Sequence, residues 1–205
     1  MINSKNKSPV RNHMMLVHLS LFKTVGLVAA YLQRALAGNP WPHQRFTPRR
    51  LELSFTDVLE ASPQEVFPLL CPVREYEWIE DWQCELVHSK SGFAEKGCVF
   101  TTQLALGETW VCSRYEPPRL LEFVINAGSH LAVTFGATLA PTARGTEICW
   151  TRTLTSLDSV GDRVVRRYSE GAYQKEMELL ARRLKHYLAT GQCLQTGEAL
   201  VNRTL

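Results

Sequence analysis

The sequence predicts an α+β domain in which a curved antiparallel sheet of about seven strands wraps around a long C-terminal helix, with two short helices after the first strand. Three observations support this prediction. Short segments rich in β-branched and aromatic residues follow one another between residues 51 and 155. Short turns separate most of them, which favours antiparallel neighbours. One long amphipathic segment then ends the domain and needs a partner surface, which only the sheet provides.

The composition is that of one globular domain, because 45% of the 205 residues are hydrophobic and 21% are charged. The net charge of +3 hides an asymmetry. Residues 1–50 contain eight Lys or Arg and no acid, so the rest of the chain holds 15 of the 23 bases and all 20 acids, a formal charge of −5. With no zinc finger, basic helix or base-stacking motif, this domain is not predicted to bind nucleic acid.

The N-terminal fifty residues are interpreted as a basic extension followed by a linker. Residues 14–38 are apolar after a basic start, and Ala35 to Ala37 resemble a secretory cleavage site. Lys23 interrupts the apolar run, and a lysine near the centre of a membrane span costs about 2.5–3.5 kcal/mol. We favour a loosely attached helical extension over a signal peptide; an interfacial helix touching a membrane is permitted but not favoured. Residues 39–50, with three prolines, read as the linker.

The rest of the chain is divided into a domain at residues 51–190 and a C-terminal tail at residues 191–205. The cysteines form no CxxC pair and lie mostly in apolar runs, and the six histidines are scattered. Reduced, buried thiols are therefore predicted in preference to a metal site, and no cofactor is predicted. This usage favours a cytoplasmic location. The cysteines are Cys71, Cys84, Cys98, Cys112, Cys149 and Cys193.

The two short helices expected after the first strand are predicted to close the mouth or edge of the sheet. Residues 51–59 alternate between apolar and polar, as a strand does. Ser62 and Pro63 suit the start of a short helix. Pro68 and Pro72 disfavour one continuous helix, so a second short helix, rich in aromatic residues, is expected after Pro72.

Six more strands are expected, and their alternation predicts which side chains face inward. An outward Glu122 fixes the phase of its strand, and apolar residues share one face of the last strand. The expected strands are residues 84–88, 97–106, 108–116, 120–126, 130–140 and 146–155. The expected inward residues are Leu121, Phe123, Ile125, Val133, Phe135, Ile148, Trp150, Arg152 and Leu154.

The phase of strand 108–116 depends on one charged residue. Placing Arg114 outside puts Val111, Ser113 and Tyr115 inside and sends Trp110 outward. An outward tryptophan makes this phase less secure than the others.

The last long element is predicted as one helix over residues 159–190. Ser159 with Asp162 three residues later resembles a capping box, and Gly191 is a natural C-cap. At the helical period its apolar face comprises Val165, Ala172, Tyr173, Met177, Leu180, Leu184 and Tyr187. The opposite face comprises Arg163, Arg167, Gln174, Glu178, Arg182 and Lys185.

The strand-to-helix passage has an aliphatic residue, Ala, Ser and Pro, then Val and an aromatic residue. With further matches along the chain, it resembles the START-like, polyketide-cyclase-like superfamily called SRPBCC, over roughly residues 51–190. The resemblance implies the helix-grip fold with an apolar ligand cavity. Pro68 departs from the family pattern, in which the first helix continues, and this concerns the shape of the lid. The matching residues are Leu59, Ala61, Ser62, Pro63, Val66, Phe67, Tyr76, Trp78, Gly97 and the segment 109–123.

The inward residues supply a wall for such a cavity, although plain core packing is the alternative for each apolar one. Arg152, Ser169 and Glu176 fall on apolar faces, where a charge must be paired, meet a ligand or reach solvent. One hypothesis is that Arg152 anchors a carboxylate or phenolate with Glu176 as its internal partner; solvent exposure is the alternative. The candidate ligand-binding residues are Phe67, Leu70, Trp78, Trp82, Val111, Ser113, Tyr115, Phe123, Ile125, Val133, Phe135, Trp150, Arg152, Ser169, Tyr173, Glu176 and Met177.

Three functions are compatible with these residues. The first is a binding or carrier protein for a hydrophobic or aromatic small molecule, since no catalytic constellation is visible. The second is a polyketide cyclase or aromatase-like enzyme, in which cavity Arg and Tyr residues and His88 or His130 move protons. In either case, Tyr115, Tyr168 and Tyr173 are candidate donors to a ligand carbonyl. The third is a protein-interaction module such as a chaperone regulator, which needs an exposed apolar patch.

Overall fold

The computed structural model describes residues 46–103 and 107–197. The predicted N-terminal extension, the end of the predicted strand 97–106 and the last residues of the tail lie outside these ranges. From Pro48 onward the chain forms one unit. Its elements follow the predicted order of one strand, short helices, six strands and a helical C-terminal region.

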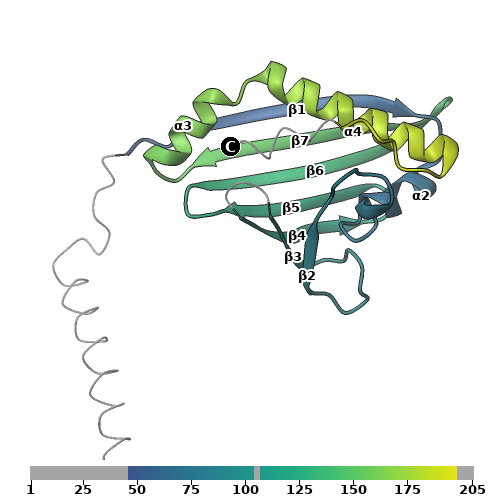
Figure 1. Cartoon of the computed structure of the whole chain (residues 1–205), viewed down its shortest axis with the longest axis horizontal. Coiled ribbons are helices and arrows are strands. Elements are labelled where there is room, and N and C mark those ends of the chain that lie inside the picture. The colour runs from purple at the N-terminus through teal and green to yellow at the C-terminus, as the bar shows by residue number, and fades with distance from the viewer. Residues whose placement is uncertain (1–45, 104–106, 198–205) are drawn as a thin grey trace, which may run out of the picture. The chain divides into compact units, whose positions relative to one another are not determined.

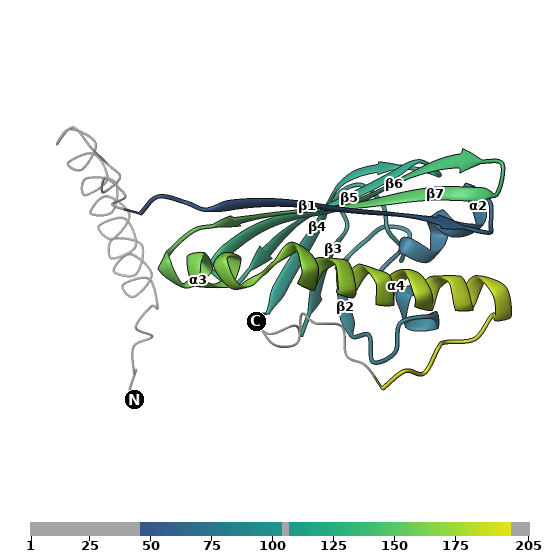
Figure 2. The same ribbon diagram turned by 90° about the horizontal axis from the view of Figure 1, so that it is seen from above.

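The seven strands form a single antiparallel sheet. They are β1 Arg50–Leu59, β2 Cys84–His88, β3 Val99–Thr102, β4 Glu108–Glu116, β5 Leu120–Ala127, β6 Leu131–Thr142 and β7 Gly145–Ser156. Their order in the sheet is β1-β7-β6-β5-β4-β3-β2, so the first strand pairs with the last. The C-terminal helices lie along one side of the sheet, as Figures 1 and 2 show together. The predicted helix-grip architecture is thus confirmed.

The central strands have the predicted inward and outward faces. On β5, Leu121, Phe123 and Ile125 are buried, whereas Val124 and Asn126 are exposed. On β7 the buried residues of the inner face are Ile148, Trp150, Arg152 and Leu154. Alternating side chains with one charged marker residue were sufficient to fix these two phases.

Strand β4 has a β-bulge that makes the predicted phase partly wrong. Trp110 is 8% exposed and faces inward, whereas Val111 is 39% exposed and faces outward. The register shifts between Cys112 and Arg114, so Ser113 has no opposite residue on β5. One extra residue reverses the alternation on either side of it. Arg114 therefore faces outward as predicted.

The segment between β1 and β2 contains less α-helix than predicted. Helix α2, Pro63–Val66, continues as the 3₁₀ helix η1, Phe67–Leu70, and the second predicted helix is the single 3₁₀ turn η2, Glu75–Glu77. Ser62 begins α2, and its backbone N–H and hydroxyl both donate to the Glu65 carboxylate, at 2.8 and 2.6 Å. Pro68 lacks the N–H that an α-helix needs, so the tighter 3₁₀ geometry replaces it.

The predicted single C-terminal helix is two helices, α3, Ser159–Arg167, and α4, Glu170–Thr190. Tyr168 between them has extended backbone geometry. The Ser169 hydroxyl accepts a hydrogen bond from the Ala172 N–H at 3.1 Å and so caps α4. Apolar periodicity continues across this break, which is why the sequence pattern did not show it.

The ends of these helices are capped by local residues. Asp158 caps α3 in place of the predicted Ser159, because its carboxylate accepts from the N–H groups of Val160 and Gly161, both at 2.9 Å. Gly191 ends α4 with a left-handed φ of 69°, as its position after the last apolar residue predicted.

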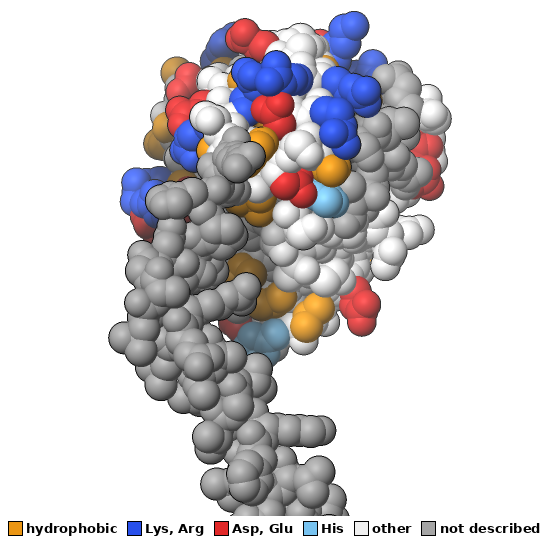
Figure 3. Space-filling model, turned by 90° about the vertical axis from the view of Figure 1, so that its left-hand side faces the viewer, with side chains coloured by type: hydrophobic (Ala, Val, Ile, Leu, Met, Phe, Trp, Pro, Cys, Tyr) orange, Lys and Arg blue, Asp and Glu red, His pale blue; other side chains and the backbone are white. Residues whose placement is uncertain are grey.

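Basic side chains gather on the face of the molecule shown in Figure 3. Arg163, Arg166 and Arg167 are exposed on α3. Asp162 lies among them and pairs with Arg166 at 2.6 Å and with Arg49 at 3.1 Å. Such exposed pairs contribute little to stability, but they reduce the local positive charge.

Candidate functional site

A pocket of about 460 Å³ lies between the sheet, the segment from Leu70 to Gln83, and helix α4. This volume is in the range of small-molecule sites. The sheet contributes Phe100, Trp110, Leu121, Phe123, Phe135, Gly136, Ala137, Trp150 and Arg152. The segment before β2 contributes Leu70, Pro72, Glu75, Trp78, Ile79, Glu80, Asp81, Trp82 and Gln83, and the remaining lining residues are Gln103, Glu176 and Leu180.

The sheet side of the pocket is a cluster of packed aromatic rings. The centroids of Phe100 and Trp110 are 5.2 Å apart in a stacked arrangement. Phe123 packs edge-on to both, at 5.4 and 5.6 Å, and Phe135 lies 6.1 Å from Trp110. Because each ring is held by its neighbours, this wall presents a preformed apolar surface.

The tryptophans opposite the sheet have their polar N–H groups turned into the protein. Trp78 Nε1 donates to the Leu69 carbonyl and Trp82 Nε1 donates to the Pro72 carbonyl, both at 2.9 Å. On the sheet side, Trp110 Nε1 donates to the Glu108 carboxylate at 2.9 Å. These three indole N–H groups are satisfied within the protein, so the rings offer only apolar surface to a ligand.

A buried polar cluster joins β7 to α4 at the pocket. Arg152 is 7% exposed and Glu176 is 4% exposed. Arg152 Nη1 donates to both carboxylate oxygens of Glu176 at 3.0 Å and to Tyr168 Oη at 2.7 Å. Tyr168 Oη in turn donates to Glu176 Oε2 at 2.5 Å. The predicted internal pairing of Arg152 with Glu176 is therefore present, and Tyr168 at the helix break completes it.

The electrostatics of this cluster fix its protonation. Burial has the largest single effect and lowers the pKa of Arg152, but Glu176, Tyr168 and Tyr173 together raise it by more, so the guanidinium stays charged. Burial raises the pKa of Tyr168 and of Tyr173, so both hydroxyls stay protonated. The Arg152 guanidinium also lies 4.9 Å from the Phe135 ring centroid. The positive and negative charges offset each other, and the cluster offers polarity without net charge.

Two further carboxyl groups near the aromatic wall differ in their partners. Glu108 accepts from Trp110 and, at 3.2 Å, from the Thr102 hydroxyl, and burial raises its pKa. Glu75 has no side-chain hydrogen bond within the described residues, and burial raises its pKa to about 8. A carboxyl group with this pKa is mostly protonated at neutral pH.

The structure brings eight of the predicted site residues to the pocket. They are Leu70, Trp78, Trp82, Phe123, Phe135, Trp150, Arg152 and Glu176. Six others pack in the hydrophobic core without lining the pocket: Phe67, Tyr115, Ile125, Val133, Tyr173 and Met177. Phe67 and Tyr115 pack against each other, with centroids 5.5 Å apart.

Three predicted site residues lie neither in the pocket wall nor in the hydrophobic core, so their prediction was wrong. Val111 faces outward because of the β4 bulge. Ser113 lies in that bulge, and its hydroxyl donates to the Glu122 carboxylate at 2.8 Å. Ser169 is exposed at the start of α4, because the helix breaks there.

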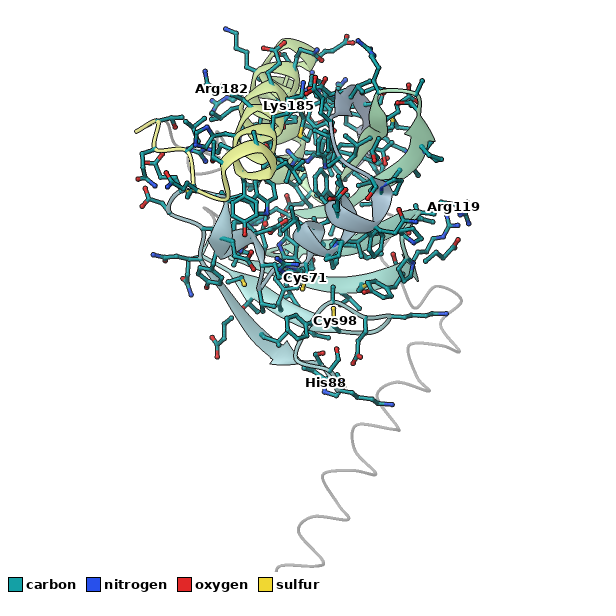
Figure 4. All side chains as sticks on the ribbon, turned by 90° about the vertical axis from the view of Figure 1, so that its right-hand side faces the viewer. Cys71, His88, Cys98, Arg119, Arg182 and Lys185 are labelled. Carbon is teal, nitrogen blue, oxygen red and sulfur yellow. The ribbon has the colours of Figure 1, made fainter. Side chains whose placement is uncertain are left out.

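Neither candidate histidine lines the pocket. His88 ends β2 and is exposed, and Figure 4 shows it at the edge of the sheet, away from α4. His130 Nδ1 lies 2.7 Å from Asp158, the residue that caps α3. Arg182 and Lys185, also labelled in Figure 4, lie on the exposed side of α4.

Several pocket residues were not among the predicted site residues. Phe100 and Trp110 were not predicted as site residues. The bulge in β4 and the shortness of β3 leave too little regular alternation to show that these side chains face inward. Glu75 and Gln103 lie in a 3₁₀ turn and just after a strand, where no periodicity indicates direction. Glu75 directly precedes the aromatic residue Tyr76 in a segment with Trp78 and Trp82, and this was the available signal.

The described part of the chain has neither a metal cluster nor a membrane-spanning helix. Across residues 46–103 and 107–197, no three His, Cys, Asp or Glu side chains are placed to hold a metal ion. No helix in the same residues is long and apolar enough to cross a membrane. The six cysteines are free, and Cys71, Cys98 and Cys112 are buried.

Comparison with known proteins agrees with this fold. A protein from Rhizobium leguminosarum has a TM-score of 0.51 at 15% identity, covering 70% of this chain and 97% of its own. A protein from Mesorhizobium loti also has a TM-score of 0.51, at 16% identity, covering 68% of this chain and 97% of its own. No match was found among curated proteins.

The sequence itself matches the family described as polyketide cyclase / dehydrase and lipid transport over residues 50–185. This match spans all seven strands of the sheet and most of α4. It agrees with the SRPBCC resemblance that the strand-to-helix passage carries. The chain therefore belongs to the polyketide cyclase / dehydrase and lipid transport family.

Proposed function

We propose that this protein binds and carries an uncharged hydrophobic or aromatic small molecule in the pocket between the sheet, the segment before β2, and α4. The observation that carries this proposal is the form of the wall. Packed aromatic rings face the pocket, and three of their indole N–H groups already have protein partners. Burial of a ligand's apolar surface against this wall is favourable by about 25 cal/mol per Å².

The buried cluster supports an uncharged ligand over an anion. The Glu176 carboxylate already neutralises Arg152 and accepts two of its hydrogen bonds. An incoming carboxylate or phenolate would therefore meet a negative charge beside the positive one. A carbonyl or hydroxyl oxygen can use the remaining donor groups of Arg152 without that repulsion.

The carrier function is tested by what the protein retains from its own host. Native mass spectrometry and solvent extraction of protein purified from that host should release an apolar compound. Leu180→Trp fills part of the pocket from α4 and should reduce the recovered amount. Leu188→Trp changes the same helix at a partly buried position that does not line the pocket, and should leave recovery unchanged. Repeated recovery of empty wild-type protein would contradict a carrier.

A cyclase or dehydratase-like enzyme is the second candidate, and one observation favours it. Glu75 in the pocket wall has a pKa of about 8, close enough to neutral for proton exchange with a substrate. If the retained compound is a substrate, Glu75→Gln should still bind it but fail to convert it. Binding without conversion by the wild-type protein would leave the carrier as the function.

A further inference from the structure

Glu75 is a carboxyl group of the pocket wall whose side chain has no hydrogen bond or ion pair within residues 46–103 and 107–197. The residues on both sides of it are held firmly. Arg74 makes a bidentate ion pair with Glu77, at 2.7 and 2.9 Å. Tyr76 Oη donates to the Cys84 carbonyl at 2.7 Å and accepts from the Cys84 N–H at 2.9 Å. A fixed turn therefore presents the Glu75 carboxyl to the pocket.

The surroundings of Glu75 keep its carboxyl uncharged. Burial alone raises its pKa from 4.5 to about 8. Its side chain is only half-buried by area because its open side faces the pocket. The titratable and charged groups around it, from its own segment, β2, β7 and α4, are Cys71, Cys84, Glu80, Asp81, Arg152 and Glu176.

None of these neighbours supplies a compensating positive charge to Glu75. Burial raises the pKa of the Cys71 and Cys84 thiols, which stay neutral. Arg152 is neutralised by Glu176. Glu80 accepts from the Thr196 N–H at 2.9 Å and is directed to the C-terminal segment. A negative charge on Glu75 would therefore be isolated in the pocket wall.

A protonated carboxyl has one O–H donor, and an unsatisfied donor in an apolar site is unfavourable. We propose that Glu75 donates a hydrogen bond to an uncharged acceptor oxygen of the ligand, a ketone, quinone or ether oxygen, and thereby selects oxygenated over purely hydrocarbon ligands. This inference rests on the proposed ligand-binding function and specifies the ligand class. The ligand has an apolar or aromatic body that fits the ring cluster and an acceptor oxygen that faces η2.

Two probes of nearly equal shape test this selection: fluorene, a hydrocarbon, and fluorenone, which has a carbonyl in place of the methylene group. Both are titrated into the 205-residue protein, and the change in tryptophan fluorescence gives the dissociation constants. The readout is local, because Trp78, Trp82, Trp110 and Trp150 line the pocket. At about pH 6 the wild type should bind fluorenone about five- to tenfold more tightly than fluorene.

The pH and three variants separate hydrogen bonding from shape. At about pH 9.5 the Glu75 O–H is lost, so the wild-type preference should disappear. Glu75→Gln keeps an N–H donor and should prefer fluorenone equally at both pH values. Glu75→Leu should show no preference at either pH. Glu85→Gln changes an exposed carboxyl group of β2 outside the pocket lining and should behave as wild type.

The outcomes distinguish this inference from the proposed function. Fluorene affinity is the internal measure of a folded pocket and should be similar in wild type and Glu75→Leu. If fluorene binds but Glu75→Leu keeps the fluorenone preference, Glu75 is not the donor while ligand binding stands. If neither probe binds the wild type, both the inference and the proposed pocket function are wrong.

Discussion

At the scale of single residues, two carboxyl groups on one 3₁₀ turn have opposite electrostatics. Glu77 pairs with Arg74 and accepts from Tyr187 Oη at 2.5 Å, and its pKa is lowered to about 2. Glu75, two residues earlier, has no such partner, and burial raises its pKa to about 8. The same residue type thus acts as a structural anion at one position and as a neutral pocket group at the other.

These two pKa shifts predict opposite effects of pH on stability. Between about pH 4.5 and 8 the unfolded chain releases the Glu75 proton while the folded protein keeps it, so this group lowers stability as pH rises. Glu75→Gln should therefore raise the melting temperature relative to wild type more at pH 8 than at pH 5, measured by circular dichroism.

Glu77 provides the matched comparison for that experiment. Its lowered pKa contributes stability above about pH 4.5, which is lost as pH falls towards 2. Glu77→Gln should therefore lower the melting temperature at pH 7 and have less effect at pH 3. An equal shift at pH 5 and pH 8 for Glu75→Gln would show that Glu75 is ionised in the folded protein.

The buried pair of Arg152 and Glu176 predicts that substitutions of its two members have non-additive effects on stability. Arg152→Met removes the guanidinium that pairs with the buried Glu176 carboxylate, and should cost about 3–5 kcal/mol in the free energy of unfolding. Arg152→Met with Glu176→Leu removes both charges and should be less destabilised than Arg152→Met alone. Urea denaturation measures the free energy of unfolding of each variant. A double variant whose loss of stability equals the sum of the losses for Arg152→Met and Glu176→Leu alone would contradict a coupled pair.

At the scale of elements, the break between α3 and α4 positions the pocket cluster. Tyr168 lies in this break and hydrogen-bonds to both Arg152 and Glu176. Helix α3 also packs very closely on the turn between β5 and β6. A Cβ atom on Gly161 would lie 2.0 Å from the His130 carbonyl oxygen.

That close approach predicts opposite effects of one substitution at two helical glycines. Gly161→Ala gains helix propensity but meets the His130 backbone, and should destabilise the protein by about 1–3 kcal/mol. Gly171→Ala, where a Cβ atom meets nothing within 4 Å, should stabilise it by about 0.5–1 kcal/mol. Chemical denaturation compares them, and a stabilising Gly161→Ala would show that α3 does not pack as described.

The elements also show how far the sequence could predict this structure. Strands β5 and β7 were predictable because regular alternation and one outward charge fix every side chain. The β4 bulge was not, since one unpaired residue, Ser113, reverses the phase without any change in composition. The helix break was equally hidden, because Ser169 is a good N-cap inside an otherwise continuous apolar period.

At the scale of the whole molecule, the pocket depends on residues far apart in the chain. The lining residues that were predicted correctly lie in elements with a regular apolar pattern or are apolar residues near prolines. Glu75 was missed because its direction is set by the turn it lies in, which depends on contacts such as that of Tyr76 with Cys84. Gln103 was missed because it directly follows the end of β3. Resemblance to a family indicated the cavity, but only the packed structure shows which polar groups reach it.

The pairing of β1 with β7 determines when during synthesis the sheet can be completed. Arg50 opposes Thr155 in the sheet, so the first strand to leave the ribosome waits for the last strand to be translated. Such non-local pairing is slow, and β1 has no sheet partner in the meantime. Because β7 and α4 both line the pocket, the pocket is complete only after nearly the whole domain has been synthesised, and β1 is the segment most open to mispairing until then.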